Sequence, residues 1–399
     1  MNNFEYHSPT NIIFGKGVEQ QIGERVAECG CKKLMIVYGG GSVKRSGLLD
    51  RVKESLSEHN IKYVELGGVV PNPRLSLVHK GIQICREENV DMLLGLGGGS
   101  SLDTAKALAM GVYYDGDVWD IIEGRAKLEK ALPTCNILTL AATGSETGSG
   151  TVITNDTLGG AMLKKGTKHQ LLRPVFTLLN PELMYTLPPY QTASGVVDII
   201  MHTFERYFVP SGVNEMTDRI AEALLKTVMQ YGVICYNEPE NYTARSEVMW
   251  AGSLSHNFIT GLGRVQDWAS HQMEHELGAM FDVAHGAGLA AVWGSWARYV
   301  CKENDIIMRF ARYGVNVLGL PMNYAEPERT ALEAIEATER YFKQLDMPIC
   351  ISELIGRTLT DDEIEELSVK CTYYGKRKVG GAIKMGAEQI AEVYRMANK

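Results

Sequence analysis

Short apolar runs that end at glycines and pass into amphipathic stretches recur between residues 33 and 112. Leu34–Tyr38 leads into Gly39–Gly41, and Met92–Leu96 leads into Gly97–Ser100. Strands that break at glycines and feed helices are typical of βαβ units, whose strands are parallel. The pattern therefore predicts an α/β domain around a parallel sheet. We expect two later apolar runs, at residues 136–140 and 175–179, to add strands to this sheet.

After Leu187-Pro188-Pro189 the apolar pattern changes its period. Apolar residues then recur at helical spacing, as at Leu332 and Ile335, and strand-like runs nearly vanish. The 399-residue chain also exceeds the roughly 250–300 residues that a single hydrophobic core serves. We expect an α/β domain over residues 1–188 and an all-α domain over residues 189–399, closely packed around a cleft.

The charge balance and the cysteines limit the possible partners and the compartment. Lys and Arg number 40 and Asp and Glu 48, which gives a formal net charge of −8 and argues against binding to nucleic acid or an anionic membrane. The eight cysteines include no Cys-x-x-Cys pair, a pattern typical of free thiols in a reducing compartment. The N-terminus lacks the regions of a signal peptide. We therefore expect a cytoplasmic protein.

The turn Gly97-Gly98-Gly99-Ser100 joins a predicted strand to a predicted helix. Without side chains in the way, a phosphate can reach backbone N–H groups there, and the helix N-terminus adds partial positive charge. The turn is not a complete Gly-x-Gly-x-x-Gly fingerprint, because Ser100 takes the place of the third glycine. The alternative is a tight turn that only closes a β–α connection.

Three groups of potential metal ligands lie in the helical half. Asp198 and His202 are four residues apart and share a helical face, as do His271 and His275, and His285 follows shortly after. One Asp with several His is a ligand set that suits Fe²⁺ or Zn²⁺. The alternative for any one pair is a satisfied polar contact inside the protein.

Together these motifs resemble the iron-containing (group III) alcohol dehydrogenases, in particular the branch of NAD(P)H-dependent butanol dehydrogenases and aldehyde reductases. The resemblance runs from Asn11–Gly17 to Ala387–Ile390 and includes Gly97–Lys106, Ala142–Glu146 and Asp267–Leu277. It implies the dehydroquinate synthase-like architecture of this family, with an N-terminal α/β dinucleotide-binding domain and an all-α C-terminal domain that binds the metal.

The resemblance also implies roles for individual residues. Four side chains would hold the metal, Fe²⁺ or alternatively Zn²⁺: Asp198, His202, His271 and His285. The cofactor pyrophosphate and the cofactor cleft would be bound and lined by Gly97, Gly98, Gly99, Ser100, Asp103, Thr139, Thr143 and Lys164. His275 lies one helical turn from His271, so we expect it to move a proton beside the metal, unless it only orients a neighbour.

The end of the first strand bears on the choice between NADP and NAD. Enzymes that select NAD commonly place a carboxylate there, which repels a 2′-phosphate. Here Gly39 and Gly40 are followed by Ser42, with Lys44 and Arg45 close behind and no acidic residue. We therefore expect NADP to be preferred, with NAD also possible.

The predicted function is hydride transfer between NAD(P)H and a small aldehyde or primary alcohol such as butanal or butanol, catalysed by a homodimer. Alternatives from other classes remain. His271-x-x-Glu274-His275 has the form of an inverted zinc peptidase motif, although the glycine turns then serve no purpose. Glycerol dehydrogenases and dehydroquinate synthase-like lyases share the architecture. A protein that binds metal or nucleotide without turnover is the last alternative.

Overall fold

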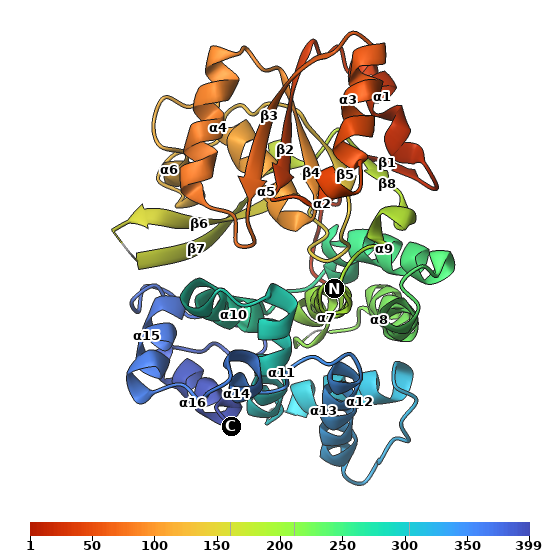
Figure 1. Ribbon diagram of the computed structural model, residues 1–399. Coiled ribbons are helices and arrows are strands. Elements are labelled where there is room, and N and C mark those ends of the chain that lie inside the picture. Colours follow the sequence, from red (N-terminus) through yellow and green to blue (C-terminus); the bar gives the residue numbers. More distant parts are fainter. Residues whose placement is uncertain (160, 211, 303) are drawn as a thin grey trace. The chain divides into compact units, whose positions relative to one another are not determined.

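Figure 1 presents the computed structural model, which describes residues 1–159, 161–210, 212–302 and 304–399. The chain divides into two compact units. One unit is His7–Thr186, and the other combines Met1–Tyr6 with Leu187–Lys399. The expected domain limits of 1–188 and 189–399 stay a prediction. None of the described helices is both long enough and apolar enough to cross a lipid bilayer.

The N-terminal unit is built on a six-stranded sheet with the strand order β1-β8-β5-β4-β2-β3. Every pair of neighbouring strands is parallel, which confirms the predicted α/β fold class. The strands are β1 (Asn11–Phe14), β2 (Lys33–Gly39), β3 (Lys62–Val69), β4 (Met92–Gly97), β5 (Thr134–Leu138) and β8 (Phe176–Leu179). The segments that follow the neighbouring strands β2, β4 and β5 therefore meet at the carboxyl edge of the sheet.

Helices cover both faces of this sheet (Figure 1). Successive side chains of a strand point to opposite faces, so Leu34 and Ile36 pack in one core cluster while Met35 and Val37 pack in the other. The first cluster includes α1 (Ile22–Glu28) and α3 (Leu48–Glu58), and the second includes α4 (Leu75–Glu87), α5 (Gly99–Gly111) and α6 (Val118–Ile122). Burial on both faces explains why the strands are continuous apolar runs. The short elements are η1 (Val18–Gln21), α2 (Ser42–Arg45), η2 (Gln170–Leu172) and η3 (Pro181–Met184).

An antiparallel hairpin that the sequence analysis did not predict follows β5. It consists of β6 (Gly150–Leu158) and β7 (Ala161–Lys168), and β6 packs against α4 and α5. Its strands are rich in threonine and lysine and lack a continuous apolar run, so the pattern that identified the buried strands could not detect it.

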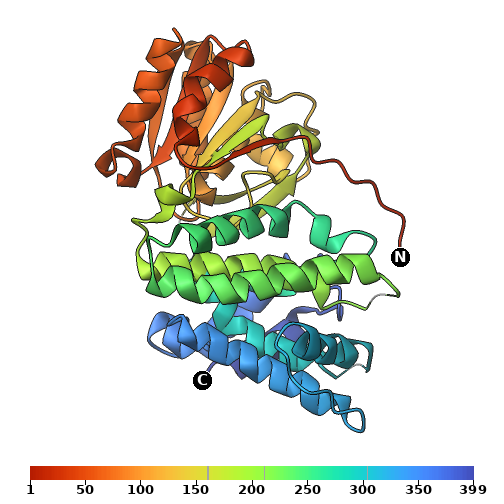
Figure 2. The ribbon, with the colours of Figure 1, turned by 90° about the vertical axis from the view of Figure 1, so that its right-hand side faces the viewer.

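The second unit is helical, as predicted, and its described residues form no strand longer than an isolated bridge. Figure 2 shows the long helices α7 (Pro189–Tyr207) and α8 (Glu215–Asn237) side by side, with α9 (Tyr242–His256) packed against both. The remaining helices are η4 (Ile259–Gly261), α10 (Ala269–Phe281), α11 (His285–Val300), α12 (Asn304–Asn316), α13 (Pro327–Gln344), α14 (Ile351–Ile355), α15 (Asp361–Cys371) and α16 (Ala387–Ala397).

Close contact between α7 and α11 fixes the first turn of α11. A Cβ atom on Gly286 would lie 2.0 Å from the backbone oxygen of Ser194, so only glycine permits this approach. Further along, Phe204 of α7 stacks on Trp293 of α11, with ring centroids 5.1 Å apart. The two helices therefore form a rigid pair, and side chains at the start of α11 are held at a defined position beside α7.

Candidate metal centre and dinucleotide site

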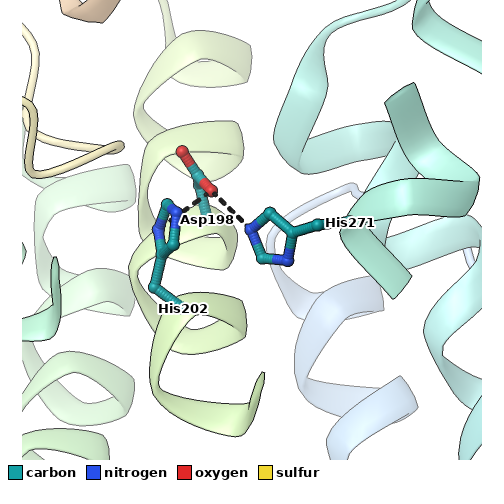
Figure 3. Close-up of side chains that lie close together, drawn as sticks. All are labelled: Asp198, His202 and His271. Atoms are coloured by element: carbon teal, nitrogen blue, oxygen red, sulfur yellow. Dashed lines mark ion pairs between the residues drawn. The ribbon is translucent and has the colours of Figure 1, made fainter. Parts of the chain in front are cut away.

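Four side chains from three helices converge on one point of the helical unit. Asp198 and His202 lie on α7, His271 lies in the first turn of α10, and His285 begins α11. The Oδ1 atom of Asp198 lies 3.3 Å from Nδ1 of His202, 3.8 Å from Nε2 of His271 and 3.7 Å from Nε2 of His285. Figure 3 shows the carboxylate between two of these rings, with a nitrogen of each directed toward it.

The donor set fits a divalent metal ion. In the described part of the chain, three buried atoms of the cluster have no hydrogen-bond partner: Asp198 Oδ1, His202 Nδ1 and His271 Nε2. Buried polar atoms normally have a hydrogen-bond partner. Potential ligand atoms that face one another without such a partner therefore indicate that a cation binds between them. Imidazole nitrogens with a carboxylate oxygen suit Fe²⁺ or Zn²⁺.

Electrostatics in the metal-free cluster favour a charged Asp198 beside a neutral His202. Burial opposes ionisation of Asp198, but the surrounding His202, His285 and His271 hold the pKa of its carboxyl below the ordinary value. Burial lowers the pKa of His202 well below its ordinary value. A neutral imidazole is the form that donates a lone pair to a metal.

Behind His271 stands a buried carboxylate that the sequence analysis missed. Glu205 of α7 lies 2.7 Å from Nδ1 of His271 and also accepts the backbone N–H groups of Trp268 and His271 at 2.6 and 3.1 Å. It therefore caps α10 and orients the ring in its first turn. Burial opposes protonation of His271, but the neighbouring carboxylates of Asp198 and Glu205 raise the pKa of its ring to about 9. Glu205 follows His202 by about one helical turn, and this spacing was the sequence signal that could have placed it near the metal ligands.

His275 and Glu274 lie beside His285, the third histidine of the cluster. Glu274 Oε2 is hydrogen-bonded to Nδ1 of His285, and the ring centroids of His275 and His285 are 5.8 Å apart. One ligand atom from each of Glu274, His275 and His285 lies within 4.8 Å of the others. His275 was expected next to the metal site, whereas Glu274 had no expected role in an oxidoreductase.

The predicted dinucleotide residues gather at the carboxyl edge of the sheet. Gly39 ends β2 and is followed by Gly40 and Ser42. The turn Gly97–Ser100 joins the end of β4 to the start of α5, and Thr139 and Thr143 follow β5. Since these strands are neighbours, the structure brings the three segments together, as in other doubly wound sheets that bind dinucleotides. Their contacts with a nucleotide stay a prediction.

Two of these glycines are required by their surroundings. Gly97 has a φ of +147°, which favours glycine, and its backbone oxygen accepts the N–H of Thr139 at 3.0 Å. A Cβ atom on Gly99 would lie 2.5 Å from Oγ1 of Thr143. The start of α5 and the loop after β5 are therefore in direct contact through a residue without a side chain.

Asp103 and Lys106 anchor the loop after β5 and the start of β6 to α5. Asp103 accepts hydrogen bonds from Oγ of Ser145 at 2.6 Å and from the N–H of Val152 at 2.9 Å. The fully buried Lys106 donates to the backbone oxygens of Ser145, Gly148 and Gly150 at 2.5, 2.8 and 3.1 Å. Asp103 was expected to line the cofactor cleft, whereas Lys106 had no expected role. Lys164 of β7 is buried, and its charge acts on Asp103.

Two family models account for nearly the whole chain. The model described as iron-containing alcohol dehydrogenase matches residues 9–181, and the model for the C-terminal part of the Fe-containing alcohol dehydrogenase family matches residues 192–397. The chain belongs to the iron-containing alcohol dehydrogenase family. Both candidate sites lie within the matched residues.

Relatives within this family are similar over their full lengths. The chain is 43% identical to NADH-dependent butanol dehydrogenase A of Clostridium acetobutylicum over 99% of both chains. It is 36% identical to the NADPH-dependent aldehyde reductase YqhD of Escherichia coli over 100% of both. The crystal structure of NADH-dependent butanol dehydrogenase A from Thermotoga maritima superposes with a TM-score of 0.94 at 35% identity, covering 100% of this chain and 99% of the other.

These findings confirm the predicted family, the fold class and the assignment as an iron-type alcohol dehydrogenase. They favour the oxidoreductase over the peptidase, lyase and non-catalytic alternatives. The geometry also argues against the peptidase, because Glu274, the residue that would activate water in that motif, is hydrogen-bonded to His285 instead. The predicted roles of individual site residues stay predictions.

Replacing Lys106 by Met should weaken dinucleotide binding and lower thermal stability. The substitution leaves three backbone oxygens without their donor, and an unsatisfied buried acceptor costs about 1–3 kcal/mol. We expect Tm to fall and the Kd for NAD(P)H, measured by fluorescence titration, to rise about tenfold. The exposed Lys127→Met is the matched control. An unchanged Kd in folded Lys106→Met protein would contradict the inference that Lys106 shapes the dinucleotide site.

Proposed function

We propose that this protein interconverts a small aldehyde and its primary alcohol, such as butanal and butanol, with NAD(P)H as the hydride donor. The observation that carries the proposal is the convergence of Asp198, His202, His271 and His285 on one point of a chain that belongs to the iron-containing alcohol dehydrogenases. The names of the Clostridium and Escherichia relatives support this class of substrate.

The side chains in and around the cluster have different roles in the proposed reaction. A divalent metal in this site, Fe²⁺ or Zn²⁺, supplies a Lewis acid that polarises a substrate oxygen. Asp198 contributes one negative charge and the imidazoles remain neutral, so the positive charge of the ion is only partly cancelled. Glu205 holds the ring of His271 in place, which leaves Nε2 directed at Asp198. We propose that His275 moves the proton that accompanies hydride transfer.

We also propose a homodimer in the cytoplasm. Strand β1 is at the edge of its sheet, and an edge strand presents backbone groups that a second chain can pair with. A light-scattering mass of about twice the 44.1 kDa of one chain is the expected result. The cytoplasmic location rests on the composition and on eight cysteines that are all free thiols.

Replacing His271 by Ala should remove both metal and activity. The change deletes one nitrogen donor, and a lost ligand should cost more than the about 10–100-fold in affinity typical of an outer partner. We expect elemental analysis of anaerobically purified protein to find the ion in wild type and in the control His79→Ala, whose half-buried side chain lies in the other unit, but not in His271→Ala. Cofactor binding should persist. Full turnover by metal-free His271→Ala would exclude the assignment.

Replacing His275 by Ala should leave the metal in place and slow the reaction. General acid–base catalysis is worth about 10²–10⁴-fold, so kcat should fall within that range while metal content stays at the wild-type level. Steady-state kinetics and elemental analysis of the same preparation measure both. Loss of the metal would instead make His275 a ligand or a support for one.

The predicted preference for NADPH over NADH is testable at Gly40. A Cβ atom there meets no other atom within 4 Å, whereas one on Gly39 would lie 3.3 Å from the backbone oxygen of Val69. Gly40→Asp should raise the KM for NADPH about tenfold or more relative to that for NADH, since a carboxylate repels the 2′-phosphate. The uncharged Gly40→Asn is the control. Equal changes with both cofactors would show that this loop does not read the 2′ position.

A further inference from the structure

A second buried carboxylate, Glu274 of α10, supports the metal-facing histidine of α11. Its side chain is fully buried, and its Oε2 atom is hydrogen-bonded to Nδ1 of His285. The other ring nitrogen of His285, Nε2, lies 3.7 Å from Oδ1 of Asp198. One nitrogen of the His285 ring is therefore hydrogen-bonded to a carboxylate, while the other nitrogen lies beside the predicted metal position.

This contact fixes the state of the ring. A neutral imidazole carries one N–H group, and an ionised carboxylate can only accept a hydrogen bond. With Nδ1–H donated to Glu274, Nε2 must hold the lone pair, which is the state that a metal ligand needs. His271 has the same arrangement, with Nδ1 at 2.7 Å from Glu205 and Nε2 facing Asp198.

The chain makes room for Glu274 one turn into α11. A Cβ atom on Gly288 would lie 2.8 Å from Cγ of Glu274 and 3.3 Å from its Oε1. Any larger residue at this position would therefore push the carboxylate away from the turn that carries His285. Together with the close approach of Gly286 to Ser194, this places both partners of the hydrogen bond on closely packed backbone.

We propose that Glu274 is a positioning residue for the metal centre, acting through His285 by fixing its tautomer and ring orientation. The proposal rests on the proposed function, since it takes His285 to be a ligand. Residues that orient a metal-bound histidine commonly contribute about 10–100-fold to metal affinity. Glu274 should therefore govern how tightly the ion is held, although it does not touch the ion.

The alternative to a positioning role is that Glu274 binds a second metal ion together with His275 and His285, since the ligand atoms of these three residues lie within 4.8 Å of one another. The direct contact between Glu274 and His285 argues against it, because a hydrogen bond leaves space between the two atoms for a proton only. His285 would also have to serve two ions at once. Elemental analysis distinguishes the two arrangements, because a second site would give two ions per chain.

The test compares metal release from three variants loaded with Zn²⁺ and the spectrum of the same proteins loaded with Co²⁺. Glu274→Ala should release Zn²⁺ to a chelator about 10–100-fold faster than wild type and shift the Co²⁺ ligand-field bands. Glu274→Gln retains an acceptor oxygen for the Nδ1–H group, so its release rate should lie between the two. Glu276→Gln neutralises a buried carboxylate on the opposite side of α10 and should match wild type.

Gly288→Ala provides a second route to the same result if Glu274→Ala does not fold. It keeps the carboxylate but crowds it, so Zn²⁺ release should again accelerate. Wild-type release rates and Co²⁺ spectra in both Glu274→Ala and Gly288→Ala would overturn the positioning role, as would two ions per wild-type chain. Wild-type protein that binds one ion but reduces no aldehyde would instead contradict the proposed function and leave the positioning role intact.

Discussion

The helical unit is organised around a carboxylate removed from water. Asp198 is 2% exposed, and the two carboxylates that face its histidine neighbours, Glu205 and Glu274, are 1% and 0% exposed. Burying each charge costs several kcal/mol unless it is paired and hydrogen-bonded. Hydrogen bonds to His271 and His285 offset part of this cost, and a divalent cation between Asp198 and the imidazoles would offset much of the remainder. The unit therefore gains stability when it binds the ion.

The same contacts join the metal centre to the packing of the helices. Glu205 completes the first turn of α10 while it orients His271, so the helix start and the ligand are fixed by one side chain. Gly286 lets α11 touch α7, which sets the position of His285 relative to Asp198. In the other unit, Lys106 fixes the loop after β5 through three carbonyl groups. Each candidate site is thus shaped by buried polar groups that hold neighbouring parts of the chain in place.

Sequence patterns predicted features that depend on spacing along the chain. The glycine-terminated strands predicted the parallel sheet, and the four-residue spacing of Asp198 and His202 predicted that both share a face of α7. Glu205 and Glu274 were not predicted as supports, because their partners lie on other helices and no periodicity reports contacts between helices. The β6–β7 hairpin was missed for a related reason, since its strands lack the apolar signal of a buried strand.

Anomalous diffraction from crystals of the metal-loaded protein would locate the ion that this account requires. Data collected on both sides of the iron or zinc absorption edge should show one peak per chain, bounded by Asp198, His202, His271 and His285 at about 2.0–2.2 Å, with Glu205 and Glu274 outside the coordination sphere. A peak among Glu274, His275 and His285, or no peak in protein that reduces aldehydes, would contradict it.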